Sequence, residues 1–234
     1  SNKNMHRNLK LFQDNIDLFL LCGFPYIIKK NLYNLPKFGT LNLHAGPLPH
    51  YKGGSPLNWQ IINGEKKIGL SVIKINNKID DGPLLKQKFF KIKYNHNIKD
   101  VHKIANNIFP KILYDSIIKI INKKKPFIKK NNKLPKYFRQ RTQKDGKINW
   151  KKLDNIKVYN LIRAITKPYH GAFSYNTKGK KITFYKASID QKKFFNLKPG
   201  QVFFSKKKIF IGTLSGEVKI EKKSGKMKNL EILK

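Results

Sequence analysis

The segment from Leu41 to Gly54, LNLHAGPLPHYKGG, constrains the fold and the chemistry of this 234-residue chain more than any other part of its sequence. Asn42 and His44 are two positions apart in an apolar run, so in a strand their side chains leave the same face. The glycines and prolines that follow predict a loop whose backbone can approach a ligand closely. Open α/β sheets bind ligands where strands end in this way. The segment therefore predicts a site at the end of a strand.

Short apolar runs alternate with helix-like segments on both sides of this strand. We expect strands at residues 16–21, 40–43, 68–75 and 84–91, and helices at residues 28–32, 56–63 and 98–122. Ser55 is a suitable cap for the second helix, and Pro110 predicts a kink or break in the third. Strands that alternate with helices predict an α/β sheet.

The C-terminal third of the sequence has a different pattern. A Lys/Asn/Pro-rich, aperiodic stretch at residues 123–136 predicts a linker. We expect a catalytic domain at residues 1–125, a linker at 126–147 and a second domain at 148–234. Within the second domain the pattern predicts a helix at 156–164 and strands at 172–175, 181–188, 201–204, 208–213 and 217–221. Five short strands with glycine-containing turns are typical of a small barrel.

Composition limits the class of protein. Hydrophobic residues make up 39% of the chain, enough for substantial cores. Cys22 is the single cysteine, which excludes an internal disulfide framework and fits a reducing compartment. No apolar run reaches the roughly 18 to 20 residues of a membrane span, and the first residues lack the order of a signal peptide. We expect a cytoplasmic protein without a membrane span.

The net charge of +38 has two interpretations. Such an excess is typical of proteins that bind polyanions such as nucleic acids. Nearly all of the basic residues are lysines, however, and lysine, asparagine and isoleucine share A/T-rich codons. Arginine, which suits bidentate phosphate and base contacts, occurs only at positions 7, 139, 141 and 163. A solvated lysine surface, with non-specific polyanion binding at most, is as consistent with this composition as a nucleic-acid interface.

Residues 41–85 resemble the central block of the 10-formyltetrahydrofolate-dependent formyltransferases, in the sequence LNLHAGPLPHYKGGSPLNWQIINGEKKIGLSVIKINNKIDDGPLL. An Asn-x-His pair, a Leu-Pro-x-x-x-Gly loop and an Asp-x-Gly turn occur in the family's order. The resemblance continues through Trp150 and residues 168–173 to about residue 234. It implies a Rossmann-like sheet followed by a small OB-like β-barrel, and transfer of a formyl group from 10-formyltetrahydrofolate to a primary amine.

The resemblance assigns the catalytic roles to Asn42, His44 and Asp80. An asparagine carboxamide can donate a hydrogen bond to an oxyanion without titrating. His44 has a side chain that titrates near neutral pH and can accept the amine proton or hold a water molecule. Asp80 can orient His44 or act as the base itself. Asp81 stands where the family usually has a small hydroxylic residue, and we expect its side chain to point outward.

The resemblance also implies a folate site built from loops. It places the pterin against the loop at residues 23–27 and the turn at residues 79–82, with the loop after His44 shaping the mouth. The residues expected to contact the folate are Gly23, Phe24, Pro25, Tyr26, Leu48, Pro49, Gly53, Ile79 and Gly82. The sequence has no G-x-G-x-x-G or phosphate-loop motif, and its histidines have no metal-ligand spacing, so we expect neither a nicotinamide cofactor nor a metal.

Two features leave the function open at this stage. Family members have a strand-helix-strand-helix unit before the segment that opens this sequence, so we expect the N-terminal part of the sheet to be missing here. The acceptor can be a nucleotide-linked amino sugar, which residues 56–59, 139–146 and 167–169 favour, or initiator methionyl-tRNA, which the charge and the barrel favour. A non-catalytic remnant or binding module is the third alternative. The sequence does not indicate an oligomeric state.

Overall fold

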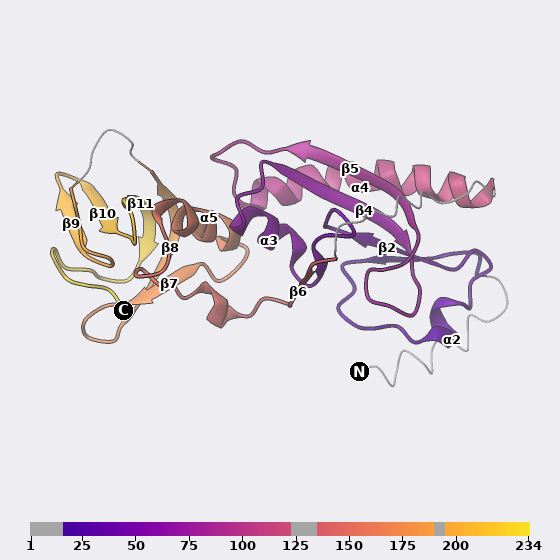
Figure 1. Ribbon diagram of the computed structural model, residues 1–234, viewed down its shortest axis with the longest axis horizontal. Coiled ribbons are helices and arrows are strands. Elements are labelled where there is room, and N and C mark those ends of the chain that lie inside the picture. Colours follow the sequence, from indigo (N-terminus) through magenta and orange to yellow (C-terminus); the bar gives the residue numbers. More distant parts are fainter. Residues whose placement is uncertain (1–15, 123–134, 190–194) are drawn as a thin grey trace. The chain divides into compact units, whose positions relative to one another are not determined.

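The computed structural model describes residues 16–122, 135–189 and 195–234 (Figure 1). Its contacts divide the chain into two compact units. The first comprises Ser1–Pro56, Lys67–Lys91 and Lys103–Arg139, and the second comprises Leu57–Lys66, Ile92–His102 and Gln140–Lys234. Of the linker expected at residues 126–147, residues 126–134 lie outside the described residues.

A four-stranded mixed sheet forms the centre of the first unit (Figure 1). Its strands are β1 (Phe19–Cys22), β2 (Thr40–His44), β4 (Lys67–Lys74) and β5 (Leu84–Lys91), in the order β1-β2-β4-β5. β1 and β2 are parallel, whereas β4 is antiparallel to both of its neighbours. The predicted α/β class and its Rossmann-like sheet are confirmed.

The sheet has a buried centre and a helical cover. All six central residues of β4, from Ile68 to Ile73, are buried. The long helix α4 (Ile98–Ile121) is joined to β5, because Lys119 Nζ donates to the Leu85 carbonyl at 3.1 Å. The structure has one continuous helix through Pro110, where we expected a kink or break. Pro110 is exposed, so the carbonyl that loses its helical partner can face water.

Short elements complete the first unit. They are α2 (Lys30–Tyr33), β3 (Lys52–Gly53) and β6 (Tyr137–Phe138). β3 and β6 form a two-residue parallel ladder, supported by the stacked rings of Tyr51 and Phe138, whose centroids are 4.7 Å apart. Gly53 is required there, because a Cβ atom would lie 2.2 Å from the Phe138 carbonyl oxygen. This ladder holds the loop after His44 and was not predicted.

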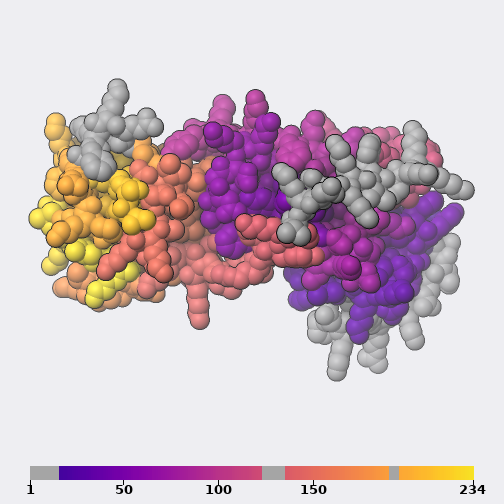
Figure 2. Space-filling model, viewed as in Figure 1, coloured from indigo at the N-terminus to yellow at the C-terminus, as the bar shows by residue number. Residues whose placement is uncertain are grey.

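The second unit contains a five-stranded antiparallel sheet in the order β7-β8-β11-β10-β9. Its strands are β7 (Ala172–Tyr175), β8 (Lys181–Ser188), β9 (Val202–Ser205), β10 (Lys208–Gly212) and β11 (Glu217–Ser224). The unit also contains most of α3 (Pro56–Ile62), together with the 3-10 helix η2 (Gln143–Gly146) and α5 (Asn155–Ile165). Figure 2 shows the atoms of the sheet, coloured orange to yellow, gathered in one contiguous body. All five predicted strands are present.

The last residues of the chain join the two edge strands of this sheet. Val202 N donates to the Glu231 carbonyl, and Leu230 N donates to the Val202 carbonyl, at the edge formed by β9. At the other edge, Tyr175 and Lys234 exchange two backbone hydrogen bonds of 2.9 and 2.8 Å. The predicted barrel-like domain is therefore confirmed, and its strand edges are bridged by residues 230–234.

The bridging segment gives a matched pair of substitutions. Leu233 is 4% exposed, whereas its neighbour Ile232 is 46% exposed. We expect Leu233→Ala to lower the free energy of unfolding by about 2 to 4 kcal/mol, because a buried leucine loses its contacts and leaves a cavity. Ile232→Ala should change it by less than about 0.5 kcal/mol. Urea denaturation followed by circular dichroism measures both, and equal effects would contradict the bridging role of this segment.

Candidate active site

Strand β2 carries the polar side chains of Asn42 and His44. Leu41 is fully buried on one face of the sheet, and the alternation along the strand places Asn42 and His44 together on the other. β1 runs parallel beside β2 and pairs Cys22 with Leu43, so the carboxyl ends of the two strands lie next to each other. The loop that starts at Gly23 therefore leaves the sheet beside His44.

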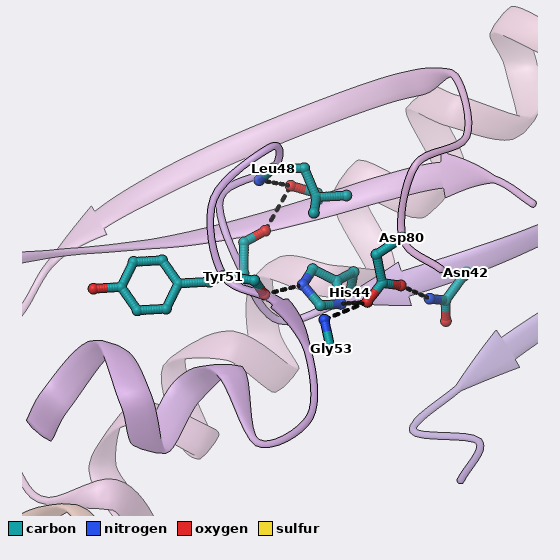
Figure 3. Close-up of polar contacts among 8 residues, drawn as sticks. Asn42, His44, Leu48, Tyr51, Gly53 and Asp80 are labelled. Carbon is teal, nitrogen blue, oxygen red and sulfur yellow. Dashed lines mark hydrogen bonds and ion pairs between the residues drawn. The ribbon is translucent and has the colours of Figure 1, made fainter. Parts of the chain in front are cut away.

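A long connection between β4 and β5 brings Asp80 to this edge. The connection is closed where Lys74 N donates to the Pro83 carbonyl at 3.0 Å. Asp80 lies between the two β2 side chains (Figure 3). Its Oδ1 accepts from Asn42 Nδ2 at 3.3 Å, and its Oδ2 lies 3.4 Å from His44 Nδ1. The structure thus brings together the three predicted catalytic residues.

The backbone of this turn is constrained. Asp80 adopts a left-handed conformation with φ +47°, which is uncommon for a non-glycine residue. Gly82 has no room for a side chain, because a Cβ atom would lie 1.7 Å from the Lys74 carbonyl oxygen. The Gly53 N–H donates to Asp80 Oδ2 at 2.8 Å and holds the carboxylate in place. The glycine of the predicted Asp-x-Gly motif is therefore a steric requirement of the turn.

His44 is buried, at 5% exposure, with both ring nitrogens engaged. Nε2 lies 2.7 Å from the Tyr51 carbonyl oxygen, and the Tyr51 ring points away from the cluster (Figure 3). A carbonyl only accepts, so Nε2 carries the proton of the neutral ring and Nδ1 faces Asp80. Burial lowers the pKa of His44, opposed by the Asp80 charge and the Tyr51 carbonyl and reinforced by Lys52. The neutral imidazole can therefore accept a proton beside a carboxylate.

Lys52 and Asp81 form an ion pair that the sequence analysis missed. The Lys52 ammonium contacts Asp81 Oδ1 and lies 5.2 Å from the centre of the Tyr137 ring. Lys52 is only 1% exposed, and the Asp81 side chain is 38% exposed. Asp81 is thus turned toward solvent on one side, as expected, but its charge is paired. A lysine directly before a glycine pair gives no sequence signal of burial.

The residues predicted to contact the folate fall into two groups. The first group is exposed or half-buried and consists of Gly23, Phe24, Pro25, Tyr26, Ile79, Gly82, Gly53 and Pro49. Tyr26 is 59% exposed and Ile79 53% exposed, so apolar surface is available at this edge. Leu48, by contrast, is buried, and its backbone is held by Ser71 Oγ and Gln87 Nε2. Leu48 therefore shapes the loop from inside.

No cluster of three or more histidine, cysteine, aspartate or glutamate side chains within residues 16–122, 135–189 and 195–234 is arranged to hold a metal ion. In the same ranges, no helix is both long enough and apolar enough to cross a membrane.

The mixed sheet followed by a barrel-like domain is the fold expected of a formyl transferase, and comparison with known proteins agrees. Residues 1–117 match the sequence pattern of the Formyl transferase family, and residues 141–231 match the Formyl transferase C-terminal domain. The chain therefore belongs to the formyl transferase family.

Its relatives differ in name and in the share of their length that this chain covers. The bifunctional polymyxin resistance protein ArnA of Wigglesworthia glossinidia brevipalpis is 39% identical over 74% of this chain and 26% of its own length. The methionyl-tRNA formyltransferase of Malacoplasma penetrans is 30% identical over 94% of this chain and 74% of its own. The chain thus spans about a quarter of the first relative and three quarters of the second.

A solved structure extends the comparison to sugars. WlaRD, a sugar 3N-formyl transferase crystallised in the presence of dTDP and 5-N-formyl-THF, superimposes with a TM-score of 0.67 at 26% identity. The match covers 91% of this chain and 73% of that one.

The buried imidazole predicts a pH dependence of stability. Folding lowers the pKa of His44 below its value of about 6.5 in the unfolded chain. As the pH decreases through about 6.5, the unfolded chain therefore takes up a proton on this imidazole before the folded chain does, and the free energy of unfolding decreases. The loss continues down to the lower pKa of the folded state. We expect His44→Gln to remove this decrease in the free energy of unfolding, which is measured by urea denaturation at a series of pH values from about 5 to about 8. The exposed His170→Gln is the matched control, and an unchanged slope in His44→Gln would contradict a buried neutral imidazole.

Proposed function

We propose that this chain transfers a formyl group from 10-formyltetrahydrofolate to the primary amine of a nucleotide-linked amino sugar. The observation that carries the proposal is the contact cluster of Asn42, His44 and Asp80 at the end of β2, in a chain of the formyl transferase family. Formyl transfer needs a donor to the developing oxyanion and an acceptor for the amine proton. The cluster contains one hydrogen-bond donor, Asn42, and two side chains that can accept a proton, His44 and Asp80.

Asn42 is the oxyanion donor in this proposal. Its Nδ2 carries two hydrogens, of which one is directed to Asp80 Oδ1. The second hydrogen can be donated to the formyl oxygen as negative charge develops on it. Because the contact with Asp80 orients the carboxamide beforehand, little reorganisation is needed during the reaction.

His44 and Asp80 act as one proton-accepting pair. The Asp80 carboxylate, whose side chain is 11% exposed, is the more accessible member and faces the amine. His44 behind it can take a proton on Nδ1, which converts the 3.4 Å approach into a charge-assisted contact. The Tyr51 carbonyl holds the opposite nitrogen and keeps the ring in this orientation.

The edge beside this cluster fits a folate. The donor supplies the reactive formyl group, and the flat pterin requires apolar surface with backbone hydrogen-bonding groups beside it. Phe24 and Tyr26 place two rings in edge-to-face contact at 5.7 Å in the loop after β1. We infer that this loop, Ile79 and the backbone of the turn to Gly82 hold the pterin, with Pro49 and Gly53 at the mouth.

The choice of a sugar acceptor is supported by a solved structure. WlaRD, a sugar 3N-formyl transferase, matches 91% of this chain at 26% identity. The residues first read as favouring a sugar have partners within the second unit. Asn58 Nδ2 donates to the Ala164 carbonyl at 2.8 Å, and Arg141 lies 4.9 Å from the Trp59 ring. We therefore assign these residues to the support of a sugar site.

Initiator methionyl-tRNA is the second candidate acceptor. The Malacoplasma methionyl-tRNA formyltransferase matches nearly the whole chain, and the charge of +38 favours a polyanion.

The catalytic assignment predicts large losses from small changes. In a formyl-transfer assay with amino-sugar nucleotide, Asn42→Ala, His44→Ala and Asp80→Asn should each lower kcat by about 100 to 1,000-fold. Asp115→Asn, at an exposed ion pair with Lys86, is the control and should retain activity. A near-normal kcat in His44→Ala at saturating donor would show that the cluster is not the catalytic centre.

The acceptor is tested by comparing formyl transfer to amino sugars and to tRNA, together with the binding of two tRNAs. We expect transfer to dTDP-linked 3-amino sugars, and tRNA binding that ignores the aminoacyl group and falls steeply with salt because counterions are released. Initiator and elongator tRNAs are titrated at low salt and at about 150 mM salt. Discrimination that persists at the higher salt, together with formylation of the initiator, would establish the tRNA acceptor. Absence of transfer to every amine would favour a non-catalytic binding module.

A further inference from the structure

Two adjacent residues of β3 hold two adjacent aspartates. The Lys52 side chain contacts Asp81, and the next residue, Gly53, donates its N–H to Asp80 Oδ2 at 2.8 Å. β3 is itself anchored on β6, because Lys52 N donates to the Lys136 carbonyl at 3.1 Å and Gly54 N to the Phe138 carbonyl at 2.8 Å. The turn that carries Asp80 is therefore clamped at two points to a supported strand.

Burying the Lys52 ammonium costs free energy that an apolar side chain at this position would not. A lysine ammonium at 1% residue exposure is expensive to bury unless it is paired. Its partner is Asp81 Oδ1, and the Tyr137 ring lies 5.2 Å away on β6. Removing one member of such a pair leaves an uncompensated charge, whereas an apolar pair of similar volume is tolerated.

We propose that Lys52 and Asp81 are a positioning pair, which fixes the turn so that the Asp80 carboxylate contacts both His44 and Asn42. Asp80 has a strained backbone at φ +47°, and strain of this kind persists only where the surroundings hold it. The neighbouring ion pair supplies that hold one residue further along. It also neutralises Asp81, so that Asp80 is left as the carboxylate that His44 faces.

The catalytic part of this inference rests on the proposed function, and its structural part does not. The charged groups around His44 are Asp80 on the turn, Lys52 on β3 and Asp81 beside Lys52. If the pair only adjusted charge, removing both charges would restore the site. If it positions Asp80, removing both would restore the charge balance but leave the turn loose.

The test uses four variants of the full chain: Lys52→Arg, Lys52→Met, Asp81→Asn and the double variant Lys52→Met/Asp81→Asn. The pKa of His44 is measured by NMR without substrate, with its signal assigned by loss in His44→Gln. We expect the pKa to rise in Lys52→Met, to fall in Asp81→Asn and to return toward the wild-type value in the double variant. Hydrogen exchange of the Gly53 amide reports its bond to Asp80 and should quicken in Lys52→Met and in the double variant.

Activity then separates positioning from charge. We expect kcat to fall about 10 to 100-fold in Lys52→Met and in the double variant, because small misplacements of a catalytic group cost this much. KM for the donor should change by a smaller factor than kcat, since the same turn also holds the pterin in our proposal, and Lys52→Arg should retain most of the activity. Asp115→Asn and Lys86→Met, at the exposed pair, control for charge and should change neither readout.

The outcomes are distinct. Wild-type kcat and Gly53 exchange in the double variant would overturn the positioning role, even if the pKa of His44 moved as expected. A wild-type chain without transfer activity would refute the proposed function alone, because Gly53 exchange and the pKa of His44 would still test the clamp.

Discussion

The Asp80 carboxylate is the contact on which the rest of the site depends. It joins three segments that are far apart in the sequence, namely β2, β3 and the connection after β4. A carboxylate only accepts hydrogen bonds, so each of its neighbours must present a donor. Asn42 Nδ2 and the Gly53 N–H do so, and His44 does so once Nδ1 is protonated. Proton uptake by the imidazole therefore completes the hydrogen bonding of Asp80, which couples the chemistry of the pair to its geometry.

Much of the fold could be predicted because local pattern and final structure agree. The strands β2, β5, β7 and β8 lie where apolar periodicity placed them, and the helix α4 fills the predicted range apart from its last residue. The ladder between β3 and β6 could not be predicted, because each strand has two residues and no periodicity. The bridging of the barrel edges by residues 230–234 likewise depends on long-range backbone bonds that leave no pattern in the sequence.

The site was predictable for a different reason. Asn42 and His44 share a face by the two-residue period of a strand, but nothing in their spacing locates Asp80, which is 36 positions from His44. Only the family resemblance supplied that residue. The burial of Lys52 was missed because lysine is almost never fully buried unless it is paired, and its partner Asp81 lies 29 positions away. Pairs of this kind become visible only when the loop that carries one member is folded against the turn that carries the other.

The charge of the chain does not decide between the two acceptors. A nucleotide-linked sugar carries phosphates, as tRNA does, so an excess of lysine attracts both. What separates them is the type of contact, because tRNA discrimination requires base or shape readout in addition to phosphate attraction. Arginine suits such readout better than lysine, and the described residues contain three arginines, Arg139, Arg141 and Arg163. Arg163 is buried, where it donates to the Asn160 side chain and the His96 carbonyl, and Arg141 donates to the Asp145 carbonyl. Because Arg141 and Arg163 make these contacts inside the second unit, most of the positive charge acts through lysines, which attract phosphate without selecting a sequence.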